Sequence, residues 1–547
     1  MGKTTRSRIF AWVIALASPS VALVALVALS GGAGLLSGCA VSDADVRRWE
    51  TTEQGPRKLY AVITHDKFAW SLRVEAALSL IRMKPRNGKH LAIPLLVDGF
   101  KDENGEFREG ALIALSPDTR RKMIDSMSEE LEKNIEAPPP PKNADGSRPP
   151  DPSTNFKDAA FAMLSHDPPL VDDPAVRARL SAAIIQWANA DFETRLDTSQ
   201  QFGIEQMFRW LGASSVKNLP ALLVESSTKT DRICSLIHDL GDPDTKQRAS
   251  VALVTMAKNI DSKAWIDKQR ALVEDADRRA NQKVTPQQLD QQVQKYQEQE
   301  LIKVFTAMKK VGGRPSIDYA LAYAAEKNNP PERRKAALAA LEGYVDKNNP
   351  GDVDKLFEVA RDDTTPDDVR DLAFQRLGEL PKDLVVTKMY TLFNAPQWKV
   401  RWVAASLVLK TLSTRGLGDF MARLPKSAAT KMGMTEPISY GALIQKMDAP
   451  AGEPKPRDAA TAFLGSHDLG PKLAALGFFY DGRKGDVGVV QPYENDGTAV
   501  PKCEEKDQCG WSCDVPKAPG SQDKETKEIR TVGDFVRFCV IPSMDNP

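Results

Sequence analysis

The chain has 547 residues, enough for three or four domains or for one long repeat array. Its composition, 41% hydrophobic and 27% charged, is that of folded proteins and excludes a wholly disordered chain. Lys and Arg together number 74, as do Asp and Glu, and this balance argues against a nucleic-acid binder. The 5 His residues are too few for a His-rich metalloprotein.

The first 38 residues have the organisation of a secretory signal. An uncharged, apolar stretch at residues 9–38 follows three basic residues, Lys3, Arg6 and Arg8. The stretch runs into Leu-Ser-Gly-Cys at 36–39, which resembles the bacterial lipobox, in which the Cys is lipidated and then becomes the first residue of the mature protein. This resemblance implies that residues 1–38 are a lipoprotein signal peptide and that Cys39 is the lipidation site.

An uncleaved membrane anchor is the alternative, since the apolar stretch is long enough to cross about 30 Å of hydrocarbon. Pro19 and the Gly31-Gly32 pair make this reading weaker. With lipidation, two or three acyl chains would hold the protein on a bilayer outside the cytoplasm, and Ala40, in place of an Asp, favours the outer over the inner membrane. We predict a flexible tether at residues 39–55, with a reach of about 20–25 Å.

Residues 56–414 have the apolar spacing of paired helices. A recurring signature places Pro or Asp at a helix start, then an Arg, then small and aliphatic residues three, four and seven positions on. Its copies are centred on Arg73, Arg177, Arg248, Arg334, Arg370 and Arg401. Spacings of 31–36 residues between the later copies are typical of a repeat of two helices.

This signature resembles HEAT and HEAT-like repeats, whose helix pairs stack into an α-α superhelix, or solenoid. In those families an Arg of the second helix braces neighbouring repeats through acidic loop residues. The resemblance implies a mainly α solenoid over 56–414, and we interpret the recurring Arg residues as structural. A Pro-rich loop at 136–154 and a helical insertion at 261–312 depart from the pattern, and Asn104-Gly105 predicts a small β-hairpin.

Four His-Asp doublets are the first candidates for catalysis, at His65, His166, His238 and His467. HD-type phosphohydrolases use such a doublet, but they need further His and Asp ligands that this chain cannot supply four times. We therefore expect the first three doublets to lie at turns between paired helices, with the His near a helix C-terminus and the Asp as a turn or cap residue. With no Gly-x-Ser-x-Gly elbow either, the sequence predicts no catalytic residue and no metal site.

Residues 415–477 predict further terminal helices, and from 478 to 547 the helical pattern fades. Short apolar runs at 485–490, 503–513 and 536–541 suggest strands. Four Cys lie here, Cys503, Cys509, Cys513 and Cys539. In an exported chain two disulfides are a better explanation than a zinc site, with three pairings open, and the resulting module would cap the repeat array or form a ligand-binding head. Cys234, among aliphatic residues, predicts a buried thiol.

A solenoid presents a long concave face that binds proteins over a large area. Together with the export signal, this favours a non-catalytic, lipid-anchored scaffold or adaptor of the cell envelope, without a cofactor, whose partners are proteins near the membrane. Two alternatives stay open. One is an exported hydrolase or lyase on a helical-repeat scaffold, since repeat proteins of the phycobilin-lyase type share the pattern, and the other is a purely structural envelope component.

Overall fold

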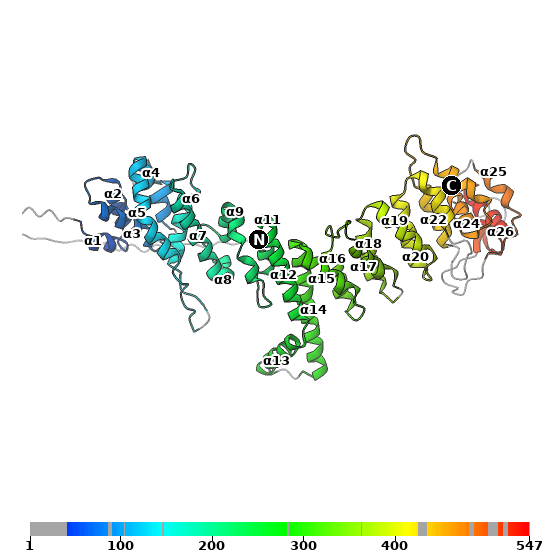
Figure 1. The fold of residues 1–547 in the computed structure, drawn as a ribbon, viewed down its shortest axis with the longest axis horizontal. Helices are drawn as coiled ribbons and strands as arrows, with labels where there is room; N and C mark the ends of the chain where they lie inside the picture. Colours follow the sequence, from blue (N-terminus) through cyan, green and yellow to red (C-terminus); the bar gives the residue numbers. More distant parts are fainter. Residues whose placement is uncertain are drawn as a thin grey trace, which may run out of the picture. The chain divides into compact units, whose positions relative to one another are not determined.

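The computed structural model describes residues 41–545, except for gaps at 86–89, 103, 145–146, 199, 282–283, 363, 425–434, 481–485, 501–511 and 518–522. The described chain is mainly helical (Figure 1). It forms two compact units, the first ending at Leu115 and the second beginning at Ser116. Cys39, Cys503 and Cys509 lie outside the described residues.

The first unit is a group of short helices with one small hairpin. Its elements are α1 (Asp43–Trp49), α2 (Gly55–Thr64), α3 (Trp70–Arg82), the π-helix η1 (Pro94–Asp98), β1 (Phe100–Lys101), β2 (Phe107–Arg108) and α4 (Ala111–Ala114).

The expected tether at residues 39–55 is not flexible throughout, and this prediction was wrong for most of its length. Ser42 and Asp45 form a capping box that starts α1. Val46 is fully buried, because α1 packs against α2 and α3. Glu50 accepts a hydrogen bond from Arg82 at 2.9 Å. The sequence reasoning missed this helix because seven residues are too few for a clear apolar period.

The predicted hairpin at Asn104-Gly105 is confirmed. β1 and β2 pair antiparallel, with Phe100 opposite Arg108. The Asp102 carboxylate accepts backbone N–H bonds from Asn104 and Glu106, both at 3.0 Å, and so closes the turn.

The second unit begins with a run of helices over residues 117–260. They are α5 (Pro117–Ile135), α6 (Ser153–Ser165), α7 (Pro174–Ala190), α8 (Phe192–Asp197), α9 (Ile204–Leu211), α10 (Ala213–Val216), η2 (Leu219–Leu222), α11 (Thr230–Leu240) and α12 (Pro243–Ile260). The described residues of the Pro-rich stretch between α5 and α6 are non-helical, as predicted. Arg148 ties it to Asp191 at the end of α7, with 2.9 Å between nitrogen and oxygen.

The expected insertion follows as α13 (Lys263–Arg279) and the N-terminal half of α14 (Pro286–Val311). A capping box of Thr285 and Gln288 starts α14 at the predicted position. Trp265 stacks on Tyr296, with ring centroids 5.6 Å apart, and is the only buried residue of α13. Leu289 and Val293 are buried and form the apolar stripe at the start of α14.

Paired helices continue to residue 423 and beyond. The elements are α15 (Arg314–Ala325), α16 (Pro331–Ala340), α17 (Pro350–Arg361), α18 (Asp367–Gly378), α19 (Lys382–Thr391), η3 (Leu392–Asn394), α20 (Trp398–Thr411), η4 (Thr414–Gly416) and α21 (Leu417–Arg423). Over α15 to α18 each helix contacts its partner and the equivalent helix of the other pair, so that α15 meets α16 and α17, while α16 meets α18. Each pair buries its apolar stripe against a neighbour.

The C-terminal part contains α22 (Thr435–Gln445), α23 (Pro456–Leu464), α24 (Leu469–Phe479), α25 (Val487–Val490), η5 (Gln491–Tyr493), β3 (Ser512–Pro516), β4 (Lys524–Glu528), α26 (Val532–Phe535), the π-helix η6 (Val536–Val540) and α27 (Ile541–Asp545). All residues of α24 are buried. It crosses α22 closely at Gly441 and Gly477, where an added Cβ would lie 2.3 and 2.4 Å from backbone atoms of the other helix.

The expected strands of this module are only partly right. Residues 512–516 and 524–528 pair antiparallel, but 487–490 of the first apolar run and all of 536–541 are helical. A capping box of Thr531 and Asp534 starts the second of them. Val532, Val536 and Val540 follow at four-residue spacing, which is a helical period, and all three are fully buried. The sequence suggested a strand because valine is common in strands.

Candidate functional site

The recurring arginines act mainly as braces inside each helix pair. Five of them donate a hydrogen bond to a carbonyl near the end of the preceding helix or in the turn after it. The bonds are Arg73 to Ile63 (2.9 Å), Arg177 to Val171 (2.8 Å), Arg334 to Ala324 (2.8 Å), Arg370 to Thr365 (2.8 Å) and Arg401 to Ala395 (2.6 Å). These five hydrogen bonds are the contacts that a structural role requires.

Arg248 does not belong to this series, and the sequence grouping was wrong for it. The five braces each occupy the fourth position of their helix, which the caps define. Arg248 is the sixth residue of α12. Two residues further along a helix turn the side chain by about 200°. Arg248 therefore pairs with Asp244 on its own exposed surface, at 2.9 Å.

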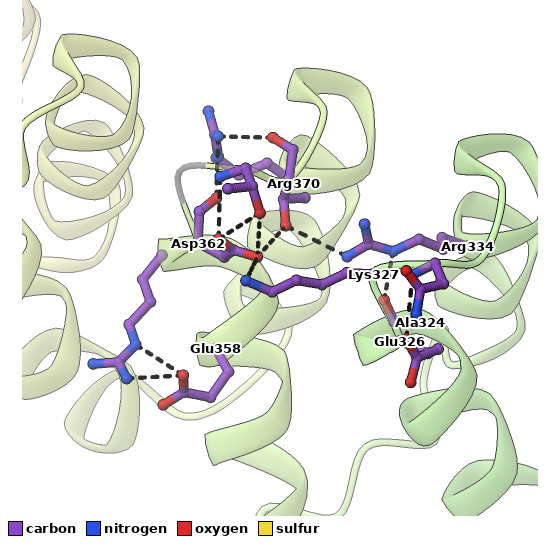
Figure 2. A network of polar contacts seen from close by, with 11 residues as sticks. Ala324, Glu326, Lys327, Arg334, Glu358, Asp362 and Arg370 are labelled. Carbon is purple, nitrogen blue, oxygen red and sulfur yellow. Dashed lines mark hydrogen bonds and ion pairs between the residues drawn. The ribbon is translucent and has the colours of Figure 1, made fainter.

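A polar network joins the pair α15 and α16 to the pair α17 and α18 (Figure 2). Lys327, after α15, forms an ion pair of 2.8 Å with Asp362, after α17. Arg334 donates to the Thr365 hydroxyl at 3.4 Å as well as to Ala324. Arg370 donates to the Asp362 carbonyl at 3.2 Å. Neighbouring pairs are thus held together by the loops that follow their first helices.

Asp362 is the acidic centre of this network. Burial alone would raise the pKa of its carboxyl, but bonds from Lys327 and from the Thr364 amide and hydroxyl lower that pKa to about 2. The carboxylate is therefore charged at every physiological pH. It holds Lys327 in place between the two helix pairs.

A solvent-open hollow of about 460 Å³ lies beside this network and is named here the arginine hollow. Its polar lining is Lys327, Arg334, Glu358, Arg361 and Asp362. Three cations thus face two carboxylates, of which Glu358 pairs with Arg361 at 2.8 Å. Arg334 is only 3% exposed. Its two hydrogen bonds come from Nε and Nη2, while Nη1 donates to none of the described residues.

A second hollow of about 370 Å³, named here the tyrosine hollow, lies on the other side of the end of α15. Tyr319 and Tyr323 of α15 line it together with Asp261, which follows α12. The tyrosine rings lie 5.8 Å apart, and Tyr323 packs edge-on against Phe305 at 5.2 Å. The last turn of α15 therefore separates an aromatic hollow from a cationic one.

Burial shifts the titrating groups of the tyrosine hollow. It raises the pKa of Asp261, although Arg333 opposes the shift from 3.3 Å. It also raises the pKa of Tyr323, and the Asp261 charge adds to this. Arg333 lies near enough to lower the Tyr323 pKa, yet the pair does not reach hydrogen-bond geometry, so the hydroxyl has no partner among the described residues.

The His-Asp doublets lie at helix ends, as predicted. His65 and His166 end α2 and α6, and His238 is in the last turn of α11. Asp66 lies in the turn after α2, as predicted, and pairs with Arg73 at 2.8 Å. The predicted turn or cap role was wrong for Asp239, which lies inside α11 and pairs with Arg209 at 2.9 Å. The helices that follow the second and third doublets are capped instead by Asp173 and Asp242.

The cysteines that the structure describes fall into two kinds. Cys513 of β3 and Cys539 of η6 form a disulfide, which is one of the pairings that the sequence left open. Cys234 is a free thiol, fully buried as predicted. Burial raises its pKa to about 12, so the reactive thiolate is scarce.

Among the buried charges that sequence reasoning missed is Lys157 of α6, which is fully buried. Its ammonium contacts Asp158 at 2.5 Å, the Gln200 side chain at 2.7 Å and the Phe202 carbonyl at 2.8 Å. It also lies over the Trp187 ring, 4.7 Å from the centroid. Burial lowers the Lys157 pKa. These three contacts use all the ammonium hydrogens, so Lys157 is a structural centre, and a single Lys in a helical pattern gave no signal of it.

In the described part of the chain, no group of three or more His, Cys, Asp or Glu could hold a metal ion. No helix there is long and apolar enough to span a membrane. In comparison with known proteins, no family model matches the chain and no curated protein matches it significantly in sequence.

Proposed function

We propose that this chain is an exported lipoprotein that holds protein partners near a membrane through a surface built from stacked, HEAT-like helix pairs. The single observation that carries the proposal is the contact pattern of α15 to α18, in which each helix meets the equivalent helix of the next pair. Such stacking produces an extended, open binding surface. The arginine and tyrosine hollows are open features of this surface.

The arrangement of charges favours binding over catalysis. An enzyme of the hydrolase or lyase type needs an acid or base with a suitable pKa beside a nucleophile or a bound water. In the arginine hollow, Asp362 has a pKa of about 2 and Glu358 is paired with Arg361. These groups are better suited to holding a partner by charge than to transferring protons.

Lipidation at Cys39 would place the first unit close to the bilayer. Because α1 begins at Asp43, only residues 40–42 would separate the lipidated residue from folded structure. Four residue steps span at most about 14 Å. Partners of the nearest surface would then be membrane proteins or proteins at the membrane surface, and Ala40 favours the outer membrane.

Metabolic labelling with an alkyne fatty acid tests the anchor. We expect the wild-type protein and a Cys234→Ala control to carry the label and to sediment with membranes. The Cys39→Ala variant should carry no label and keep its signal stretch. A Cys39→Ala variant that is labelled as strongly as wild type would contradict the lipoprotein assignment.

A photo-crosslinking residue tests partner binding. It replaces Lys327, exposed beside the arginine hollow, or Lys410, exposed at the end of α20, in the full-length protein. We expect the same envelope protein to be recovered from position 327 in repeated experiments and to be depleted from position 410. Equal, non-selective adducts at both positions would argue against a discrete binding surface.

A further inference from the structure

We propose that the arginine and tyrosine hollows together bind one extended segment of a partner protein, with a carboxylate side chain in the arginine hollow and an aromatic or aliphatic side chain in the tyrosine hollow. This inference rests on the proposed function, because it names the chemistry of the partner. Both hollows lie against the last turn of α15, so a single segment crossing that turn reaches both.

The arginine hollow has unused capacity for one anion. Its lining carries three cations against two carboxylates. Arg334 is 3% exposed as a residue, and its Nη1 donates to none of the described residues. A guanidinium is a strong donor to a carboxylate, since charge-assisted hydrogen bonds are about twice as strong as neutral ones.

The internal carboxylates do not satisfy this donor. Asp362 accepts from Lys327 and from the Thr364 and Thr365 hydroxyls, while no bond joins it to Arg334. Burial lowers the pKa of Arg334 despite the nearby Asp362 and Glu326 charges. A carboxylate of the partner would supply the negatively charged hydrogen-bond acceptor that this guanidinium lacks.

The tyrosine hollow suits a different side chain. Tyr319 and Tyr323 provide ring surface, which suits an aromatic or aliphatic side chain. Aromatic rings generally pair with their centroids about 4.5–7 Å apart. The Tyr323 hydroxyl is buried, so this residue contributes to the hollow through its ring. The same lining carries one cation, Lys258, and two acids, Asp261 and Glu326, so no excess of positive charge draws a second carboxylate there.

The separation of the hollows sets the spacing of the partner's side chains. Packed helices lie about 8–10 Å apart, and the hollows lie on the two sides of one helix end. A polyproline II segment rises about 3.1 Å per residue with three residues per turn, so residues i and i+3 share a face about 9 Å apart. We therefore expect an acidic residue and an apolar residue three positions apart.

The test is selection of peptides from a displayed library of random dodecamers on the full-length protein, followed by fluorescence anisotropy with the selected peptides. We expect enrichment of an Asp or Glu three positions from an aromatic or aliphatic residue. Changing that acid to its amide in the synthetic peptide should weaken binding at least tenfold, as for loss of a charged hydrogen bond, and raising the salt concentration should weaken it further.

Arg361→Glu and Arg423→Glu form a matched pair of protein variants. Both arginines are 52% exposed, and both pair with an acid on their own helix, Glu358 and Asp419 respectively. Only Arg361 lines the hollow. We expect Arg361→Glu to weaken peptide binding at least tenfold and Arg423→Glu to change it less than twofold.

Two sets of results would overturn the inference. Selected peptides without an acid, or peptides whose affinity is equal for wild type and Arg361→Glu, would remove the arginine hollow as the site. A failure to select any peptide would do the same. The scaffold proposal would survive these results if the crosslinker at position 327 still recovered one envelope protein, and would fall with the inference if it did not.

Discussion

The ion pair of Arg401 and Glu436 is the most stringent test of the bracing role. The two side chains are 6% and 3% exposed, and they meet through two bonds of 2.8 and 3.0 Å. Arg401→Met would leave Glu436 buried with one remaining side-chain bond from the described residues, from the Tyr440 hydroxyl at 2.6 Å. Removing one partner of a buried pair costs about 3–5 kcal/mol.

Hydrogen exchange measures this cost locally, which is necessary because a chain of this size does not unfold in two states. At about 1.4 kcal/mol per tenfold, the amides of α20 and α22 should exchange roughly 100-fold to several-thousand-fold faster in Arg401→Met. Amides of α2 and α3 should not change.

Arg248→Met is the control, since the exposed pair with Asp244 is worth about 0.3–0.5 kcal/mol. Replacing Arg401 and Glu436 together by Met and Leu should recover part of the loss, because no buried charge is then left unpaired. If Arg401→Met exchanged at the wild-type rate, the buried pair would not hold α20 to α22, and the bracing argument would fail.

Three further outcomes follow from single groups. Because the Asp362 pKa is depressed to about 2, the charged carboxylate contributes on the order of 1–2 kcal/mol to stability above about pH 4, and this contribution is lost as the pH falls towards 2. Asp362→Asn should abolish this pH dependence in the hydrogen exchange of α17, and an unchanged pH profile would contradict the argument. Cys513→Ser opens a link across 26 residues, worth about 3 kcal/mol in the chain-entropy model, and should speed limited proteolysis between β3 and η6, with equal digestion refuting the estimate. Cys234 should resist iodoacetamide in the native protein at pH 8 and react after denaturation; rapid native labelling would be incompatible with its burial and its pKa of about 12.

The helices were predictable from the sequence because their starts are chemically marked. Asp173, Asp242 and Thr285 each precede a Pro, and each side chain accepts an N–H bond from the first turn of its helix. These local signals do not depend on distant contacts. The hairpin at Asn104-Gly105 was predictable for the same reason, since its turn is closed by the neighbouring Asp102.

The errors lie where tertiary packing decides. The short α1 is helical because Val46 is buried against α2 and α3, which no window of sequence reveals. Residues 536–540 are valine-rich and suggest a strand, but a cap at Thr531 and burial every fourth residue make them helical. Arg248 was grouped with the braces because the sequence pattern did not fix its position relative to the helix start.

The candidate site was beyond sequence reasoning for a related reason. Lys327, Arg334 and Asp362 each look like ordinary surface charges in a solvated pattern. They come together only because one helix pair stacks on the next, which brings the loop after α15 beside the loop after α17. Only Arg334 gave a signal, through its place in the recurring signature.

The same arginine therefore has two roles that must be separated experimentally. Nε of Arg334 braces α15 to α16 through the Ala324 carbonyl, while the other end of the guanidinium lines the arginine hollow. Its replacement would disturb the packing and the recognition together, and loss of binding would say little about either. Arg361 lacks the brace and shares the hollow, so a binding defect in Arg361→Glu with unchanged hydrogen exchange in α16 and α18 would assign the defect to recognition.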